Sequence, residues 1–477
     1  MQIDEEYFRS EEFQELLESY ETSVETGDTP FLDVDDLVDL ADYFSWKRDD
    51  KQAEQVIALA LELYPDATLP NVFRARRALE EEDYAAARAY AEQIGNHDDP
   101  DYHYLMAEIM ISEGDVEGAD RYLHEYGKTV EADEQEDFYR DCANLFIDYN
   151  VSEKAYEWIM RSHGDNSEDY KELMGRTLLA LGKYTESERI FNELLDRQPF
   201  STTYWNALAT AQLMTEDFSD AITSSEYAIA INPNDADAFI NKGNALLRIG
   251  NYEEAVKCYK RYSELEPDDE SGPFYQGICL TNTGRTREAI EVLEHAYELA
   301  PDNSIYLAQI CQDLAFAYSA DRQVDKALEM LDKTKTLDCD HVDMMVVRGH
   351  ILLQNGYVKE AEDAFTKAIK HSNNAPAVLL RIIVSLYDNH YLNACYQMLL
   401  KFLAMTREYY PQFTDGNAYM ALCCYDLRRT DEFMKYLRIA VDQNPYEAQQ
   451  VLSCLFPDEM PVSNYVKYME EKLNIKN

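Results

Sequence analysis

The chain has 477 residues, of which 46% are hydrophobic and 12% aromatic, so it is long enough and apolar enough to bury a substantial core. These values exclude a disulfide-stabilised mini-protein and a chain that is disordered throughout. Acidic residues outnumber Lys and Arg by 92 to 43, which gives a net charge of −49. Because affinity for nucleic acid and anionic lipid comes mostly from cations, neither is a good candidate partner.

The sequence shows no feature of an exported or membrane-spanning protein. Its first residues lack the basic and apolar regions of a signal peptide. The most apolar stretch, Ala375 to Leu386, is interrupted by Arg381 and is shorter than the roughly 18 residues that a spanning helix needs. The nine cysteines lie mainly within apolar helical patterns rather than in paired loops, which predicts a reducing, cytoplasmic environment.

An internal repeat is the strongest pattern in the chain. Pro199, Pro233, Pro267 and Pro301 recur at one constant interval, and each follows an apolar run with helical spacing. When the same register is continued in both directions, it divides residues 34–445 into about twelve units. The predicted units begin at Val34, Thr68, Pro100, Glu136, Glu168, Thr202, Ala236, Glu270, Ala308, Val342, Ala375 and Thr414.

Small residues recur at two offsets of the unit. The first residue of each unit is counted as offset 1. Offset 8 is then Ala or Gly and offset 20 is Ala or Ser, with Ile382 and Phe433 as the exceptions. Two amphipathic stretches joined by a short turn predict two antiparallel helices whose backbones approach closely at the small residues. Glycines between the stretches, such as Gly250, Gly284 and Gly356, can adopt the positive φ that ends a helix. We therefore predict an all-α protein, an α-solenoid of antiparallel helix pairs.

This pattern resembles the tetratricopeptide repeat family over residues 34–445. The resemblance is most detailed in one unit, through Trp205, Leu208, Ala209, Ala221, Ala228 and Pro233. It implies a right-handed superhelix in which the first helix of each pair lines the concave side. It also implies a protein-binding function rather than catalysis, although a fold by itself does not specify a function.

Segments on both sides of the repeats are predicted to cap the array, because a solenoid needs polar-faced ends. Residues 1–33 include a predicted helix near Ser10–Val24. Residues 446–477 include predicted helices near Tyr446–Leu455 and Val462–Leu473.

Two units are longer than the interval between the four prolines. The unit that begins at Glu270 exceeds it by about one helical turn, and we expect residues 303–307 to extend the following helix by that turn. The unit that begins at Ala375 exceeds it by slightly more, and we expect its second helix to run from about Tyr391 to Tyr410.

The predicted groove-facing residues change in character along the chain. In the early units they are acidic, and the candidate partner-binding residues are Asp35, Asp42, Asp101, Glu108, Asp137, Asp141 and Glu172. In the later units they are apolar, and the candidates are Phe274, Ile278, Phe316, Leu379, Ile383 and Leu422. The overall charge follows the same division, with about −33 in the first 170 residues and about −16 in the rest.

Both sets of residues allow two interpretations. The acidic residues either draw a basic, partly apolar segment of another protein into the groove, or they are helix caps, first-turn residues and a solvated face. The apolar residues either form a partner surface or are covered by the C-terminal helices. Leu386, at offset 12, is expected to pack between units.

The sequence contains no motif for catalysis, a cofactor or a metal. It has no phosphate-binding glycine loop, no His-Glu-x-x-His and no paired Cys-x-x-Cys. The acidic stretch Asp98–His103 is interpreted as capping at a helix start rather than a cation site. We predict a non-enzymatic protein-interaction scaffold without catalytic residues, cofactor or metal. The alternative is a regulatory or assembly protein that forms a homo-oligomer through its C-terminal repeats.

Overall fold

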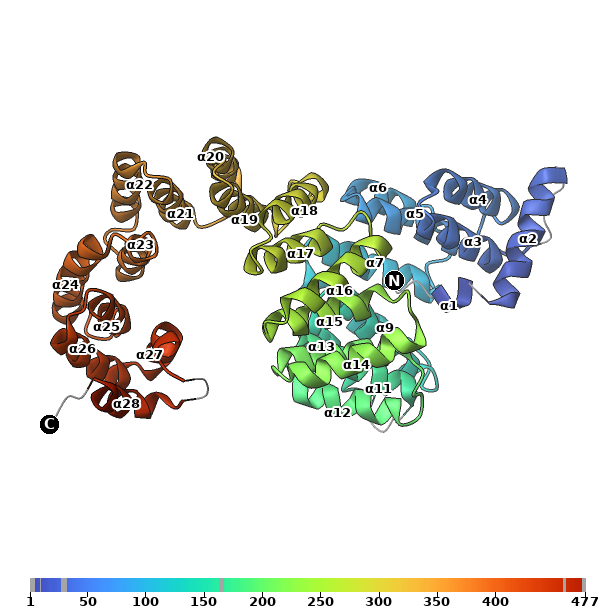
Figure 1. Cartoon of the computed structure of the whole chain (residues 1–477). Helices are drawn as coiled ribbons and strands as arrows, with labels where there is room; N and C mark the ends of the chain where they lie inside the picture. Colours follow the sequence, from blue (N-terminus) through green and yellow to red (C-terminus); the bar gives the residue numbers. More distant parts are fainter. Residues whose placement is uncertain (1–4, 9, 27–31, 163–166, 458–459, 474–477) are drawn as a thin grey trace. The chain divides into compact units, whose positions relative to one another are not determined.

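All regular elements that the computed structural model describes are helices (Figure 1). The described parts of the chain are residues 5–8, 10–26, 32–162, 167–457 and 460–473. The chain divides into two compact units, Met1–Pro233 and Asn234–Asn477. The protein is an all-α solenoid of antiparallel helix pairs, as the sequence predicts.

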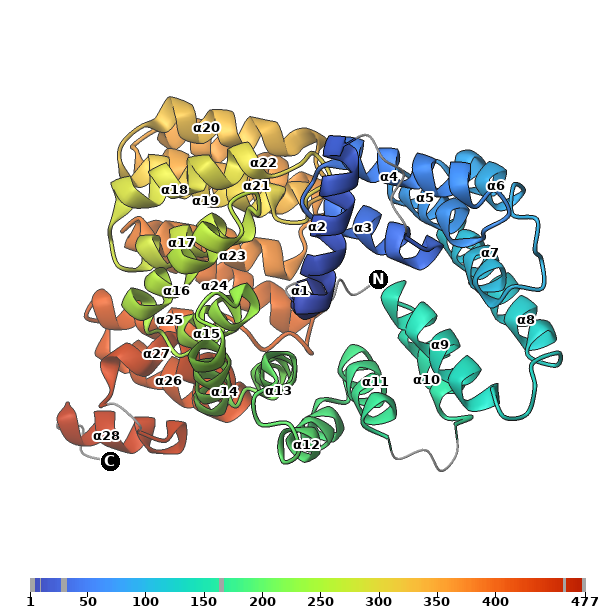
Figure 2. The ribbon, with the colours of Figure 1, turned by 90° about the vertical axis from the view of Figure 1, so that its right-hand side faces the viewer.

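In the first unit, helices pack as antiparallel pairs from α3 with α4 to α13 with α14. The first helices of successive pairs also contact each other, from α3 with α5 to α9 with α11, so they share one side of the stack (Figure 2). The helices of this unit are α1 (Glu5–Phe8), α2 (Glu11–Thr26), α3 (Val34–Trp46), α4 (Asp50–Leu63), α5 (Leu69–Glu80), α6 (Tyr84–Ala91), α7 (Pro100–Ser112), α8 (Val116–Tyr126), α9 (Gln135–Asp148), α10 (Ser152–Ile159), α11 (Glu168–Ala180), α12 (Tyr184–Leu195), α13 (Thr202–Met214) and α14 (Phe218–Ile231).

The second unit repeats the arrangement from the pair α15 and α16 to the pair α25 and α26, after which α27 packs on α25 and α26 and α28 packs on α26. Its α-helices are α15 (Ala236–Arg248), α16 (Tyr252–Leu265), α17 (Ser271–Asn282), α18 (Thr286–Leu299), α19 (Leu307–Ala320), α20 (Val324–Lys333), α21 (His341–Gln354), α22 (Val358–His371), α23 (Pro376–Asp388), α24 (Leu392–Tyr409), α25 (Asn417–Asp426), α26 (Thr430–Gln443), α27 (Pro445–Leu452) and α28 (Tyr465–Lys472). The short 3₁₀ turns are η1 (Thr334–Thr336), η2 (Ser453–Leu455) and η3 (Val462–Asn464).

Small residues lie where the two helices of a pair approach each other, as predicted. The alanines at offsets 8 and 20 of the first four predicted units are fully buried. In α15, a Cβ added to Gly243 would lie 2.8 Å from the ring of Tyr259 in α16. Ser187 of α12, which takes the place of alanine, donates a hydrogen bond of 2.8 Å to the carbonyl oxygen of Gly175 in α11. The close contact between the two helices therefore tolerates a serine where a backbone carbonyl of the facing helix accepts its hydrogen bond.

A residue with positive φ follows the first helix of each pair. Gly250, Gly284 and Gly356, for which this conformation was predicted, have φ values of 77°, 73° and 84°. In other pairs the same place is taken by residues that bear side chains, with φ between 58° and 65°: Arg48, Glu82, Asn150, Glu216, Arg322, His390 and Arg428. Because most side chains disfavour this conformation, the packing of the pair, and not local preference alone, must maintain these turns.

One predicted register is wrong by one residue. Helix α23 begins at Pro376, and the positive-φ residue that follows it, His390, lies one position further from the predicted unit start, Ala375, than its counterparts do in the other units. As a result Cys395 is the fully buried small residue of α24, whereas Ala394 is exposed. The preceding loop contains two successive residues of positive φ, Asn373 and Asn374, and so accommodates the extra residue.

The flanking and long segments largely follow the predicted elements. The N-terminal helix predicted near residues 10–24 is α2, and the predicted long helix is α24. The extension of α19 over residues 303–307 is wrong, because α19 begins at Leu307 and the residues before it form turns. These turns place Tyr306 against Phe274 of α17, with ring centroids 5.3 Å apart.

The Gly243 contact predicts a stability effect. Replacing Gly243 with Ala forces the added methyl group against the Tyr259 ring, so we expect a loss of about 1–3 kcal/mol. The measurement is urea unfolding followed by circular dichroism. Gly95→Ala is the control, because a Cβ at Gly95 meets nothing within 4 Å. Equal midpoints for the two variants would contradict a close contact at Gly243.

Candidate functional site: an acidic pocket in the first unit

A hollow of about 900 Å³ lies between α7, α8 and α9, bordered by the loop from α8 to α9. We call it the acidic pocket, because seven carboxylates line it: Asp98, Asp101, Glu125, Glu131, Glu134, Asp137 and Asp141. Its other polar or aromatic side chains are His97, His103, Tyr104, Tyr122, Tyr126, Thr129 and Phe138. The pocket therefore combines a strongly negative rim with aromatic walls.

Helix starts bring several of these carboxylates together. Asp99 caps α7, and its side chain accepts a hydrogen bond of 3.1 Å from the backbone N–H of Asp101. This confirms the predicted capping role of the Asp98–His103 stretch at Asp99. Asp137 lies in the first turn of α9. Acidic residues in first turns complement the helix dipole, so helix formation and the negative charge of the pocket have a common origin.

The aromatic walls form a connected cluster. The ring of His103 stacks on Tyr126 with centroids 3.6 Å apart, and its Nδ1 lies 2.6 Å from the hydroxyl of Tyr122. Tyr126 also meets the ring of Phe138 edge-on at 5.6 Å, and Tyr104 lies near Phe138 at 6.2 Å. Burial lowers the pKa of His103 below its ordinary value, although the neighbouring Asp98 and Asp99 oppose the shift.

Basic side chains near the pocket neutralise only part of its charge. Lys128 pairs with Glu125 at 2.6 Å, and Arg140 pairs with Asp137. Asp141 instead accepts a neutral hydrogen bond of 3.0 Å from the Tyr104 hydroxyl. Acidic side chains thus remain in excess in this part of the chain.

The environment of two of these carboxylates disfavours their charged forms. Burial raises the pKa of Asp101 above its usual value, and Asp99 and Asp141 are among the neighbours that raise it further. Burial also raises the pKa of Asp141, with a further increase from Asp137, against the lowering effect of the Tyr104 hydrogen bond. A positive group in the pocket would relieve this repulsion.

The acidic pocket gathers three of the seven predicted acidic residues, Asp101, Asp137 and Asp141. The others lie elsewhere in the first unit. Asp35 is exposed at the start of α3. Asp42 is half-buried, and burial raises its pKa to about 6.

Two more predicted acidic residues are used by the fold itself. Glu172 accepts a hydrogen bond of 2.9 Å from the hydroxyl of Tyr204. Glu108 is 7% exposed and binds Arg76 through two bonds of 2.9 and 2.7 Å. Its prediction as a partner-binding residue is therefore corrected, because its charge joins α7 to α5. Arg76 and Glu108 both stand at offset 9 of adjacent predicted units, so the spacing could have revealed the pair.

The predicted apolar groove residues are mostly core residues. Phe274, Ile383 and Leu422 are buried, with exposures of 3%, 1% and 9%. Phe274 is covered by Tyr306, and Ile383 moves to the small-residue offset because the register of its unit is shifted by one residue. The half-buried members pack against the same cores: Ile278, Phe316 and Leu379. Leu386 is buried as predicted.

Tyr122 and Tyr126 were not predicted as site residues. They belong to α8, the second helix of its pair, whereas the predicted groove residues all come from first helices. Two features of the sequence could have indicated these residues. The end of α8 is rich in Tyr, and the loop between α8 and α9 is longer than the short turns within the helix pairs.

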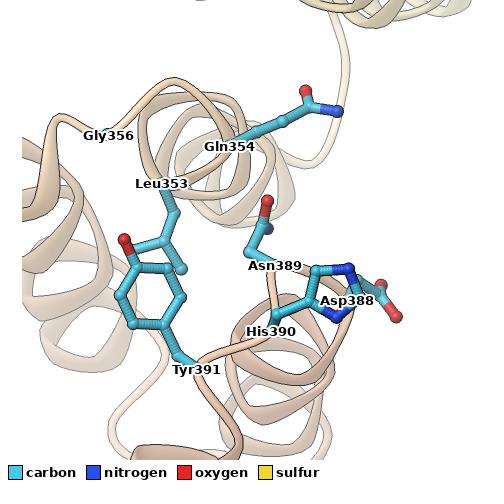
Figure 3. Close-up of a pocket in the computed structure, with 7 residues that line it drawn as sticks. All are labelled: Leu353, Gln354, Gly356, Asp388, Asn389, His390 and Tyr391. Carbon is cyan, nitrogen blue, oxygen red and sulfur yellow. The ribbon is translucent and has the colours of Figure 1, made fainter.

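A smaller hollow, of about 430 Å³, lies in the second unit between the end of α21 and the turn from α23 to α24. Figure 3 shows Asp388 and His390 together on one side, with Tyr391 beside Leu353 on the other. Burial raises the pKa of Asp388, although the nearby His390 opposes the shift. None of the predicted partner-binding residues lies in this hollow.

Two searches for other kinds of site are negative over the described residues. No group of three or more His, Cys, Asp or Glu side chains in these ranges could hold a metal ion. No helix in them combines the length and apolar character that crossing a bilayer requires.

Comparison with protein families identifies the repeats. Tetratricopeptide repeat models match residues 173–236, 236–269 and 276–303. The model of the tetratricopeptide repeat protein 21 second ARM domain matches residues 291–453. The chain belongs to the tetratricopeptide repeat family, and this membership supports a role in protein interaction.

Solved structures provide only a distant likeness. MamA 41-end from Desulfovibrio magneticus RS-1 is 19% identical, with 37% of this chain and 99% of that chain covered and a TM-score of 0.34. A crystal structure of MamA is 22% identical, with 35% and 95% covered and a TM-score of 0.32. No curated protein matches the sequence. Likenesses at these TM-scores are uninformative about function.

The Arg76–Glu108 pair predicts that Glu108 is structural. Glu108→Ala removes a buried carboxylate that accepts two hydrogen bonds from Arg76, so we expect a loss of about 2–3 kcal/mol in urea unfolding. The matched control is Glu54→Ala, which removes the more exposed partner of Arg74 and should cost less than about 1 kcal/mol. If Glu108→Ala were as stable as Glu54→Ala, Glu108 would again be a candidate partner-binding residue.

Proposed function

We propose that the protein is a non-enzymatic scaffold that binds a basic segment of another protein, with the acidic pocket as its principal contact. The observation that carries this proposal is the gathering of seven carboxylates around one hollow where, within the described part of the chain, only Lys128 and Arg140 form salt bridges with them. A basic segment would replace the repulsion among these carboxylates with attraction, and the aromatic walls would contact its aliphatic parts.

The charge distribution supports the same partner chemistry. Residues 1–170 carry about −33 of the net charge of −49, so their field attracts cations over several ångströms of solvent. The same field repels nucleic acid and anionic lipid surfaces. We therefore propose a protein partner, and no nucleic acid or membrane.

The division of the chain into repeats and capping segments is also part of the proposal. We propose about twelve units over residues 34–445, with capping segments at residues 1–33 and 446–477. The recurrent turns of positive φ support this division. All nine cysteines are free, which supports a reducing compartment such as the cytoplasm.

Self-association through the later repeats has less support. It requires an exposed apolar strip, but Phe274, Ile383 and Leu422 are buried in the cores of their own helix pairs. We therefore prefer the scaffold to the homo-oligomer.

The proposal predicts salt-sensitive binding of a basic peptide. The probe is a short fluorescein-labelled peptide of alternating Arg and Ala, measured by fluorescence anisotropy with the full chain. Changing Asp101, Asp137 and Asp141 together to Asn should raise Kd about tenfold or more, because three attractive charges are lost. Raising the salt concentration should weaken the wild-type complex in the same direction.

The matched control changes three exposed acids outside the pocket, Glu62, Glu92 and Glu153, to Gln. It removes the same total charge and should change Kd less than about twofold, because distant exposed charges are screened. Equal weakening by the two triple variants would show that overall charge, and not the pocket, binds the peptide. A peptide that does not bind the wild-type chain would also reject the proposal.

A further inference from the structure

The acidic pocket offers more than negative charge, because its carboxylates adjoin a cluster of rings. Asp141 is hydrogen-bonded to Tyr104, which lies near Phe138, and Phe138 meets Tyr126. Carboxylates alone attract any cation. Rings beside them distinguish cations by shape and hydration, because a cation must lose water to lie against a ring.

Of the two basic side chains, arginine fits this combination better than lysine. Its guanidinium is planar and weakly hydrated, stacks on aromatic rings and carries five N–H donors in a fixed geometry. It can therefore contact a ring with its plane while its edge donates to two carboxylates. The ammonium of lysine is compact and strongly hydrated, so it gains less from a ring.

The two carboxylates placed to receive such a group are Asp101 of α7 and Asp141 of α9. Both line the same hollow, from helices that face it on two sides. Burial raises the pKa of both, and Asp141 is among the neighbours that raise the pKa of Asp101. The hydrogen bond from Tyr104 occupies one oxygen of Asp141, Oδ2. The other groups that act on this pair are Arg76, Asp99, Glu108, Asp137 and Arg140, of which the acids outnumber the cations.

We propose that the acidic pocket selects arginine over lysine in the partner segment, with the guanidinium bound between Asp101 and Asp141 and against the rings of Tyr104 and Tyr126. This inference rests on the proposed function, since it names the side chain that anchors the basic segment. The volume of about 900 Å³ exceeds that of one arginine side chain, so neighbouring residues of the segment can enter as well.

The experiment compares two peptides on the full-length chain. One alternates Arg with Ala and the other alternates Lys with Ala, so both have equal length and charge. We expect the Arg peptide to bind the wild-type chain at least fivefold more tightly. The variant Tyr126→Leu should reduce this ratio to below about twofold, mainly by weakening the Arg peptide. Tyr126→Phe, which keeps the ring, should preserve the ratio.

The matched control is Tyr227→Leu, which removes an exposed tyrosine of the same unit that stacks on Trp205 outside the pocket. It should leave the ratio unchanged, and circular dichroism should show every variant to be folded. If Tyr126→Leu fails to fold, Tyr104→Leu replaces it with the same expected loss of selectivity.

The outcomes separate the inference from the proposed function. Tight, salt-sensitive binding of both peptides with equal Kd would overturn arginine selection while leaving the acidic scaffold in place. An Arg preference that survives in Tyr126→Leu, or in Tyr104→Leu where that variant replaces it, would also overturn it. Failure of both peptides to bind would reject the proposed function itself.

Discussion

The structure depends on one packing constraint, the close approach of two antiparallel helix backbones at small residues. At Gly243 even an added Cβ would come within 2.8 Å of the Tyr259 ring, so a larger side chain there would push the two helices of the pair apart. A left-handed residue must then reverse the chain within a very short turn, even where that residue is Arg48 or His390. Because this geometry recurs, successive first helices contact one another from α3 to α11 in the first unit and from α17 to α23 in the second.

The proposed function follows from the residues that this arrangement places together. Residues of α7 and α9 are more than thirty positions apart in sequence, yet their N-terminal turns border the same pocket. Each turn has its own reason to be acidic, because carboxylates stabilise helix starts. Stacking of the helix pairs brings these carboxylates together, next to the rings of Tyr122 and Tyr126 in α8. A feature that is ordinary capping in a single helix thus becomes a concentrated negative site in a stack.

Structural features that depend on local sequence pattern were predictable, whereas features that depend on contacts between residues distant in sequence were not. Helix pairs, small-residue contacts and the turns at Gly250 and Gly356 were predictable from periodicity. The register of α23 was not, because it depends on the left-handed pair before Pro376. At the site, Asp101 and Asp137 were predictable from their offsets, whereas Asp98, Glu125, Glu131 and Glu134 were not. The role of Glu108 required pairing it with Arg76 at the same offset of the adjacent repeat. Tyr122 and Tyr126 escaped prediction because they come from α8, the second helix of its pair.

If peptide binding concentrates at the acidic pocket, only the helices around the pocket should change their backbone exchange. Hydrogen–deuterium exchange of the full chain, with and without the Arg-Ala peptide, measures this, because protection reports where backbone amides become less accessible or less mobile. We expect slower exchange confined to α7, the end of α8 and the first turns of α9. Protection in the second unit alone, or spread evenly over the acidic first unit, would contradict it.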